Sequence, residues 1–308
     1  MRIVFMGTPE FAVPILSSLI GSHDVGLVIT QPDRPKGRGR KLTSPPVKVC
    51  AQDNNIPVIQ PVKLKDNREV CEIIKIKAPD VIVVAAYGNI LPKEILELPE
   101  YGCINVHASL LPKYRGAAPI NWAIINGDSM TGITIMKMSR RLDAGEIILS
   151  KKVSIDDEDN ALTLTEKLSE IGAGALMEAI GMIKDNKAVY HVQDEGQATY
   201  APMLSKDTGH INWRRSTTDI LNLVRGTYPW PGAYFYANGR MIKVTGCFAE
   251  QNIKGNPSEV LRTDRDGIQV GCVDGSVVIT SLQPEGKRPM TADEYLRGNK
   301  LEKGTVLE

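Results

Sequence analysis

The sequence lacks the patterns that mark metal sites, disulfide frameworks and dinucleotide-binding loops. Its five cysteines, Cys50, Cys71, Cys103, Cys247 and Cys272, include no Cys-x-x-Cys pair, and no histidine stands at zinc-ligand spacing. The first predicted strand ends in a turn with one glycine, so the Gly-x-Gly-x-x-Gly pattern of nicotinamide cofactor sites is missing. We therefore expect free thiols, no metal and no dinucleotide.

Long hydrophobic runs and a large excess of charge of one sign are also missing. The longest apolar stretches, such as residues 81–87, are far shorter than the roughly 20 residues of a membrane-spanning helix. The first residues lack the apolar region of a secretory signal, so we expect a cytoplasmic protein. With 37 Lys and Arg against 36 Asp and Glu, the total charge by itself argues against a nucleic-acid partner.

The first half of the chain alternates short apolar strands with helices. We predict strands at residues 2–5, 25–30, 81–86, 103–107, 132–138 and 147–155, and helices at 9–20, 46–54, 67–77 and 162–184. Continuous apolar runs are typical of strands that are covered on both faces. This alternation predicts an α/β fold with a doubly wound, mostly parallel sheet.

The pattern changes after residue 186. Residues 190–206 are polar with little periodicity, which indicates a linker between a first domain, residues 1–189, and a second, residues 207–308. The second domain has a predicted helix at 218–226. Short strands are predicted at 233–236, 241–248, 259–262, 268–272 and 276–281. These elements suggest a small β-barrel, for which the five-stranded OB type is one option among several.

Two polar residues stand two positions apart in the predicted strand 103–107. Asn105 and His107 project from one face of such a strand, and Ile104 and Val106 from the other. An amide donor beside an imidazole suits acyl transfer, in which the amide stabilises an oxyanion and the histidine accepts a proton. The alternative is that His107 only bonds to the backbone at the strand end, and the local pattern leaves both open.

Loops that follow the predicted strands contain further candidates. Asp143, in Leu142-Asp143-Ala144-Gly145, can hold the imidazole in one tautomer, although Asp-x-Gly is by itself usually a turn. Ser109-Leu110-Leu111-Pro112 is a rigid turn whose backbone groups can frame a ligand. Arg115 is most simply interpreted as a solvated loop cation, although it can also bind an anion.

Six basic residues and no acidic one lie between positions 34 and 48. They are Arg34, Lys36, Arg38, Arg40, Lys41 and Lys48. A basic loop interrupted by Gly and Pro is suited to ordering on a phosphate backbone, which it neutralises locally whatever the total charge. The alternative is a flexible solvated loop, but the length and charge of this segment favour the first interpretation.

The second domain offers weaker signals. Residues 207–308 contain 13 basic and 12 acidic side chains, so any contact with a polyanion must use local patches such as the cations of residues 297–303. Trp230 lies between two prolines. We interpret it as a packed corner rather than as a platform on which a base stacks.

Together these motifs resemble the formyltransferase family that uses 10-formyltetrahydrofolate. The resemblance rests on Asn105-x-His107, on residues 109–112 and on residues 142–145. It extends over nearly the whole chain through Gly7-Thr8-Pro9-Glu10-Phe11-Ala12, Gln31-Pro32-Asp33-Arg34-Pro35, Tyr87-Gly88-Asn89-Ile90-Leu91-Pro92, Arg115-Gly116-Ala117-Ala118-Pro119 and Pro229-Trp230-Pro231-Gly232. Arg141 departs from the pattern, because the family usually has glycine there. If that glycine has a positive φ, we expect strain at Arg141 or a reshaped loop.

The resemblance implies a Rossmann-like catalytic domain followed by an OB-like C-terminal barrel that contributes to tRNA binding. It implies that Asn105, His107 and Asp143 are catalytic. It implies that 10-formyltetrahydrofolate is held by Ser109, Leu110, Leu111 and Pro112 together with Tyr87, Gly88, Asn89, Ile90 and Leu91. It also implies that the acceptor stem of an initiator methionyl-tRNA is contacted by Arg34, Lys36, Arg38, Arg40 and Lys41.

The implied reaction is formyl transfer to the α-amino group of methionine on that tRNA, for translation initiation. No metal, membrane or obligate protein partner is expected. Two other functions stay open. A folate-dependent formyltransferase for a small amine needs neither the basic loop nor the second domain, and a non-enzymatic RNA-binding protein leaves Asn105, His107 and Asp143 without a role.

Overall fold

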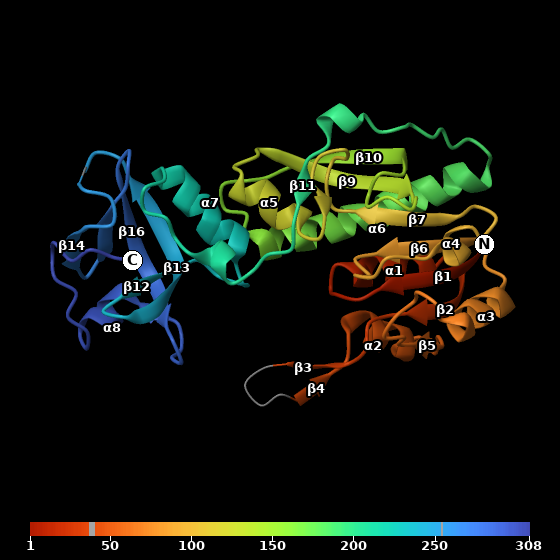
Figure 1. Ribbon diagram of the computed structural model, residues 1–308, viewed down its shortest axis with the longest axis horizontal. Coiled ribbons are helices and arrows are strands. Elements are labelled where there is room, and N and C mark those ends of the chain that lie inside the picture. The colour runs from red at the N-terminus through yellow and green to blue at the C-terminus, as the bar shows by residue number, and fades with distance from the viewer. Residues whose placement is uncertain (37–40, 254) are drawn as a thin grey trace. The chain divides into compact units, whose positions relative to one another are not determined.

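A computed structural model describes residues 1–36, 41–253 and 255–308, and the chain divides into two compact units (Figure 1). The first unit comprises Met1–Pro119, Met130–Ser154 and Thr165–Pro202. The second comprises Ile120–Ser129, Ile155–Leu164 and Met203–Glu308. In the described part of the chain, no helix is long and apolar enough to cross a membrane.

The first unit is built on a seven-stranded sheet with the order β10-β9-β7-β6-β1-β2-β5. Five strands run parallel: β1 (Arg2–Gly7), β2 (Asp24–Ile29), β5 (Val58–Ile59), β6 (Val81–Ala85) and β7 (Cys103–His107). β9 (Met130–Lys137) is antiparallel to β7, and β10 (Glu146–Ser154) is antiparallel to β9. From the central β1 the chain builds outward to β2 and then returns to β6 on the other side. The predicted doubly wound, mostly parallel sheet is confirmed.

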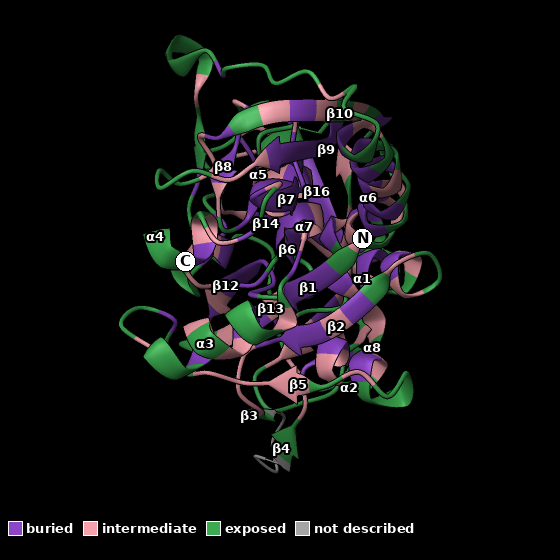
Figure 2. Cartoon of the chain, turned by 90° about the vertical axis from the view of Figure 1, so that its right-hand side faces the viewer, coloured by how far each residue is buried: buried purple, intermediate pink, exposed green. Residues whose placement is uncertain are grey.

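Helices cover both faces of this sheet (Figure 2). On one face, Val4 and Met6 of β1 pack with Val70 and Ile74 of α3 (Arg68–Lys77). On the other face lie α1 (Ala12–Ile20) and α6 (Ala161–Lys184), which approaches the sheet at Gly172. The strand residues that contact helices on one face differ from those on the other face, because alternate residues of a strand point to opposite faces. α2 (Pro46–Asp53) packs on α1, and the single turn α4 (Lys93–Leu96) adds Ile95 to the α3 side.

Three details of the first unit differ from the sequence-based expectations. α1 begins at Ala12 rather than at Pro9, whose carbonyl accepts a hydrogen bond from the Ala12 N–H in the turn before the helix. The basic segment contains a short hairpin of β3 (Arg34–Lys36) and β4 (Lys41–Thr43). Most of the expected linker 190–206 is bonded to the first unit: β11 (Tyr200–Ala201) pairs with β8 (Arg115–Gly116), after the short 3₁₀ helix η1 (Glu195–Gln197).

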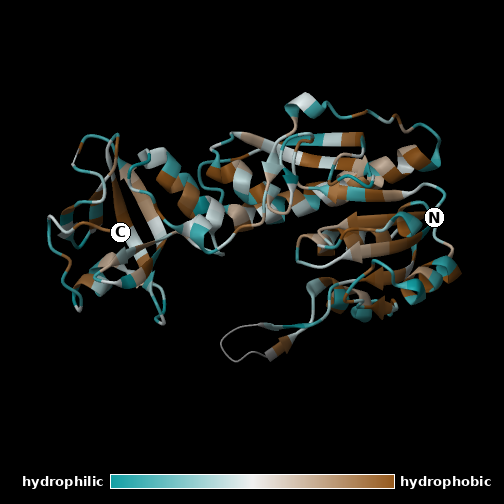
Figure 3. Cartoon of the chain, viewed as in Figure 1, coloured by the Kyte–Doolittle hydropathy of each residue, from teal (hydrophilic) through white to brown (hydrophobic). Residues whose placement is uncertain are grey.

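The second unit contains an antiparallel sheet with the order β12-β13-β16-β15-β14. The bounds are β12 (Tyr234–Ala237), β13 (Arg240–Glu250), β14 (Val260–Asp264), β15 (Gly267–Gly271) and β16 (Ser276–Pro284), with β17 (Met290–Thr291) paired to β16. α7 (Thr217–Thr227) packs on β13 and β16, α8 (Ala292–Leu296) packs on β16, and η2 (Asp207–Gly209) contacts α7. α5 (Pro119–Ile125) donates from Asn121 to the carbonyl of Gly226 in α7. The five predicted strands are confirmed. In both units the strands concentrate hydrophobic residues, and the connecting loops are mainly hydrophilic (Figure 3).

Candidate active site

The candidate catalytic residues lie at the edge of the sheet where the parallel strands of the first unit end. β7 is in register with β6 at Val84↔Asn105 and with β9 at His107↔Thr134. Because alternate residues of a strand share a face, Asn105 and His107 point the same way, as the sequence predicts. In doubly wound sheets, ligands bind at this edge beside the point where the strand order reverses, which here lies between β1 and β6.

His107 is buried between two hydrogen-bond acceptors. Its side chain is 6% exposed, its Nε2 lies 3.0 Å from the carbonyl oxygen of Tyr114, and its Nδ1 lies 3.8 Å from Oδ2 of Asp143. The backbone contact that the alternative interpretation expects and the acidic partner are therefore both present. The contact with Tyr114 is a hydrogen bond, whereas the approach to the Asp143 carboxylate, at 3.8 Å, is longer than one.

Asn105 is 8% exposed and precedes His107 by two residues on the same face of β7. Among the residues that the structure describes, its side-chain amide makes no hydrogen bond. A buried amide without a protein partner is suited to donate to an oxygen of a ligand. Beside His107, it provides a second donor at this edge of the sheet.

Asp143 is held in a left-handed backbone conformation with a φ of 46°. Its Oδ2 accepts a hydrogen bond from the Gly116 N–H at 2.8 Å, which aims the carboxylate toward His107. The expected turn is present as well, because the Ala144 N–H donates to the carbonyl of Arg141 at 3.4 Å. Asp143 thus combines the turn with the role of an imidazole partner.

The strain expected at Arg141 is absent, because the positive φ of this loop falls on Asp143 instead. The exposed Arg141 side chain forms an ion pair with Glu195 at 2.6 Å. A glycine is therefore not required at position 141 by the backbone of this loop.

The interpretation of Arg115 as a solvated cation is wrong. Its side chain is 1% exposed and donates from Nε and Nη2 to Oε1 of Gln193 at 3.2 and 2.8 Å. Nη1 and Nη2 also donate to the two carboxylate oxygens of Glu195 at 3.1 and 3.0 Å. Hydrogen bonds from Arg115 and then from Arg141 hold the pKa of Glu195 below its usual range. Sequence reasoning missed Gln193 and Glu195, which lie 78 and 80 positions from Arg115 without any local motif.

Two loops at the same edge contain the residues expected to hold folate. In the loop after β6, Tyr87 is buried, which raises its pKa, and its carbonyl oxygen accepts from Thr8 Oγ1 and Gln31 Nε2, both at 3.2 Å. Gly88 has a φ of 84°, Ile90 is 81% exposed and Leu91 is buried. The loop is therefore anchored at Tyr87 and presents an apolar side chain at Ile90.

The loop after β7 is fixed by Thr134 of β9. Thr134 Oγ1 donates to the carbonyl of Ser109 at 2.7 Å and accepts from the N–H of Leu111 at 3.1 Å. Ser109 Oγ donates to the carbonyl of Lys113 at 2.6 Å. Leu110 precedes Leu111 and Pro112, whose peptide bond is cis. The predicted rigid turn is therefore present.

The basic segment is anchored at its base by Asp33. Asp33 forms an ion pair with Lys48 at 2.8 Å and accepts hydrogen bonds from Gln60 and Ser44, and the bonds from Gln60 and then Lys48 lower its pKa. Lys48 is therefore already paired. Lys36 and Lys41 are opposite each other in the strand pairing of the hairpin, whereas Arg38 and Arg40 lie outside the described residues.

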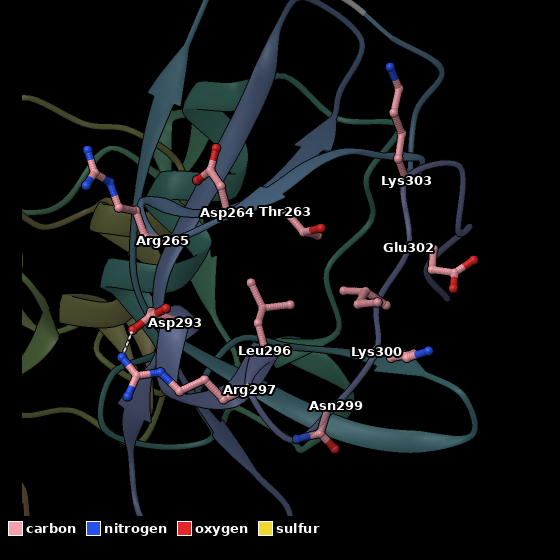
Figure 4. A pocket seen from close by; sticks show the side chains of 11 residues that line it. Thr263, Asp264, Arg265, Asp293, Leu296, Arg297, Asn299, Lys300, Glu302 and Lys303 are labelled. Carbon is pink, nitrogen blue, oxygen red and sulfur yellow. Dashed lines mark hydrogen bonds and ion pairs between the residues drawn. The ribbon is translucent and has the colours of Figure 1, made fainter.

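The second unit contains none of these residues. A cavity of about 580 Å³ is lined by Arg265, Arg297, Lys300 and Lys303 and by the acidic Asp264, Asp293 and Glu302 (Figure 4). Arg297 is paired with Asp293, so the local excess of positive charge is small. The packed-corner interpretation of Trp230 is wrong, because that side chain is 54% exposed. Over the described ranges, no group of three or more His, Cys, Asp or Glu side chains can hold a metal ion.

Comparisons with known proteins agree along the whole chain. The family described as formyl transferase matches residues 1–180, and the formyl transferase C-terminal domain matches residues 203–300. The methionyl-tRNA formyltransferase of Geotalea uraniireducens is 49% identical over 308 residues, which cover 100% of this chain and 98% of the relative. That of Acetivibrio thermocellus is 50% identical over 310 residues, which cover 100% and 99%.

Solved structures with lower identity share the fold. WlaRD, a sugar 3N-formyl transferase, superposes with a TM-score of 0.68 at 20% identity, over 94% of this chain and 99% of that one. HypX from Aquifex aeolicus in complex with tetrahydrofolic acid gives a TM-score of 0.64 at 18% identity, over 99% of this chain. The present chain spans about half the length of HypX, 51%.

Proposed function

The chain belongs to the formyl transferase family, and we propose that it transfers the formyl group of 10-formyltetrahydrofolate to the α-amino group of methionine on an initiator methionyl-tRNA. This reaction serves translation initiation in the cytoplasm. The observation that carries the proposal is the convergence of Asn105, His107 and Asp143 at the edge where the sheet of the first unit ends. Relatives named for this activity are about half identical to the chain over its full length.

The three side chains have complementary roles in this reaction. The neutral amino group of the methionine attacks the formyl carbon, and the carbonyl oxygen becomes an oxyanion that accepts hydrogen bonds from Asn105 and His107. The attacking nitrogen loses a proton to His107 or to water. As the carbonyl re-forms, the bond between the formyl carbon and N10 breaks, and N10 leaves with the bonding electron pair and takes up a proton from His107 or water. Asp143 keeps the imidazole oriented.

The folate occupies the edge between the loops of residues 87–91 and 109–112. Both loops leave neighbouring parallel strands, so they reach the same side of the sheet as Asn105. Exposed Ile90 offers an apolar surface for a planar ring, and the backbone groups of the second loop offer directed polar contacts. Neither loop contains a charged residue, which suits the neutral ring system of a pterin.

The tRNA is bound by the basic hairpin segment and by the second unit, for which we propose an OB-like barrel. Its two edge strands are linked through the last residues: Glu308 and Tyr236 of β12 exchange two backbone hydrogen bonds, and the Val260 N–H of β14 donates to the carbonyl of Thr305. We likewise propose the division into a catalytic domain of residues 1–189, a connecting segment of residues 190–206 and a tRNA-binding domain of residues 207–308.

The proposal is tested by a formyl-transfer assay with 10-formyltetrahydrofolate and three acceptors: initiator methionyl-tRNA, elongator methionyl-tRNA and a small amine. We expect transfer to the initiator tRNA to exceed transfer to the other two by at least about tenfold in kcat/KM, a difference of about 1.4 kcal/mol. Preference for the small amine would identify a different formyltransferase. Absence of both transfer and reduced-folate binding would indicate a non-enzymatic RNA-binding protein.

Removal of Arg38, Arg40 and Lys41 together is expected to weaken tRNA binding in a salt-dependent way. Each lost phosphate contact lowers the slope of log K against log salt by about 0.7 to 0.9, so the triple alanine variant should lose about two to three units of slope. A titration series between about 50 and 200 mM salt measures this. The matched control replaces Lys63, Lys65 and Arg68, three exposed cations of the first unit, by alanine. Equal slopes for the two triple variants would remove the basic segment from the tRNA site.

A further inference from the structure

We infer that Gln193 is a positioning residue for the formyl-transfer reaction and acts by fixing Asp143 relative to His107. The inference rests on the proposed function, because it concerns the same reaction. Gln193 lies in the polar stretch between the two predicted domains, yet its side chain is 6% exposed. A buried amide in an otherwise exposed segment requires partners, and its partners belong to the candidate site.

The amide of Gln193 is fully used. Its Nε2 donates to the carbonyl of Asp143 at 2.8 Å and to the carbonyl of Gly145 at 2.7 Å. Its Oε1 accepts both hydrogen bonds that Arg115 directs at it. One amide therefore uses both hydrogens and both lone pairs, and joins the loop of Asp143 to a buried guanidinium.

These bonds bear on Asp143 because its backbone is in an uncommon conformation. A non-glycine residue at a φ of 46° is less stable than one in the ordinary regions and persists only where its surroundings fix it. Gln193 binds the carbonyl of Asp143 itself and that of the glycine two residues later. Without these bonds, the loop can relax and move the carboxylate away from the imidazole.

Residues 193–199 also contact the backbone on the His107 side of the His107–Asp143 pair. Thr199 accepts hydrogen bonds from the N–H groups of Tyr114 and Arg115, at Oγ1 and at its carbonyl, at 2.9 and 2.8 Å. Tyr114 in turn bonds to His107 through its carbonyl, and Gly116 donates to the Asp143 carboxylate. Residues 193–199 therefore contact the backbone on both sides of the 3.8 Å approach between His107 and Asp143.

Glu195 adds an outer connection. It binds the buried Arg115 and the exposed Arg141, which stands two residues before Asp143. Because Glu195 and Arg141 are largely exposed, this connection is screened by solvent and contributes less than the buried amide. Gln193 is therefore the buried connection between this segment and the backbone of Asp143, while Gly116 holds the carboxylate.

The test compares Gln193→Met, which keeps the length of the side chain without its hydrogen bonds, with Gln193→Glu, which keeps an acceptor for Arg115 but cannot donate to the two carbonyls. The matched control is Gln197→Ala, an exposed glutamine of the same segment whose side chain bonds to Asp194. For both Gln193 variants we expect kcat to fall by about 10- to 100-fold with little change in either KM. The ¹⁵N shifts of the His107 imidazole should change as well. Gln197→Ala should match the parent protein in kcat, in both KM values and in these shifts.

A double-mutant cycle with Asp143→Ala decides how Gln193 acts. If it acts through Asp143, adding Gln193→Met to Asp143→Ala should change kcat less than about twofold. A multiplicative loss in the double variant, or a near-normal kcat and unchanged imidazole shifts in Gln193→Glu, would overturn the positioning role. Should the methionine variant not fold by circular dichroism, the glutamate variant decides alone. Near-normal transfer by Asp143→Ala would instead contradict the proposed catalytic site itself.

Discussion

Replacement of His107 by alanine is expected to lower kcat/KM for formyl transfer by about 10²- to 10⁴-fold, the usual contribution of a positioned acid or base. The side chain is buried, lies next to Asn105 on the same face of β7 and has a carboxylate 3.8 Å from Nδ1. An imidazole in that position can donate to the oxyanion in its protonated form and take the proton of the attacking amine in its neutral form. Alanine removes both contributions.

His107→Gln separates these two contributions. A glutamine amide can still donate a hydrogen bond but cannot take up a proton at neutral pH, so partial recovery relative to alanine would measure the donor role alone. His191→Ala is the matched control, because His191 is exposed and pairs with Ile147 only through its backbone. Binding of a reduced folate and the thermal midpoint of unfolding, Tm, show whether each variant is folded. A His107→Ala enzyme with a rate close to that of His191→Ala would exclude His107 from the chemistry.

The fold of the first unit was largely predictable because its strands are continuous apolar runs and its helices are periodic. The predicted strand at 103–107 is β7 with the same bounds, and the helix predicted at 67–77 differs from α3 by one residue. Buried parallel strands produce a strong local signal, since both faces must be apolar. The shared direction of Asn105 and His107 follows from this strand with no further information.

The surroundings of the candidate site were not predictable in this way. Arg115 resembles a loop cation and Gln193 a linker residue, because each is polar and neither lies in a periodic pattern. Their burial depends on hydrogen bonds to each other across 78 positions of chain and to further partners in the tertiary structure. Such pairing is a property of the tertiary structure, and a single sequence contains no local trace of it. The same limit explains Trp230, whose two flanking prolines give no indication of which way its side chain points.

Replacement of Asn105 by alanine is expected to reduce kcat by about 10²- to 10³-fold, as is usual when one oxyanion donor is removed. KM for both substrates should change much less, because the amide bonds to the oxygen most strongly once that oxygen carries negative charge. The measurement is steady-state kinetics with each substrate varied in turn.

Asn105→Asp gives the sharper comparison, since it has the same size and exchanges the donor for a carboxylate that faces the developing oxyanion. It should therefore be at least as slow as the alanine variant, whereas a residue needed only for packing would tolerate aspartate better than alanine. Asn54→Ala serves as the matched control, because this exposed asparagine bonds to the carbonyl of Cys50 at the end of α2. A rate for Asn105→Asp close to that of Asn54→Ala would contradict the oxyanion role. If kcat/KM fell only because KM rose, with kcat unchanged, Asn105 would be assigned to substrate binding instead. An interaction that is equally strong in the ground and transition states changes KM alone.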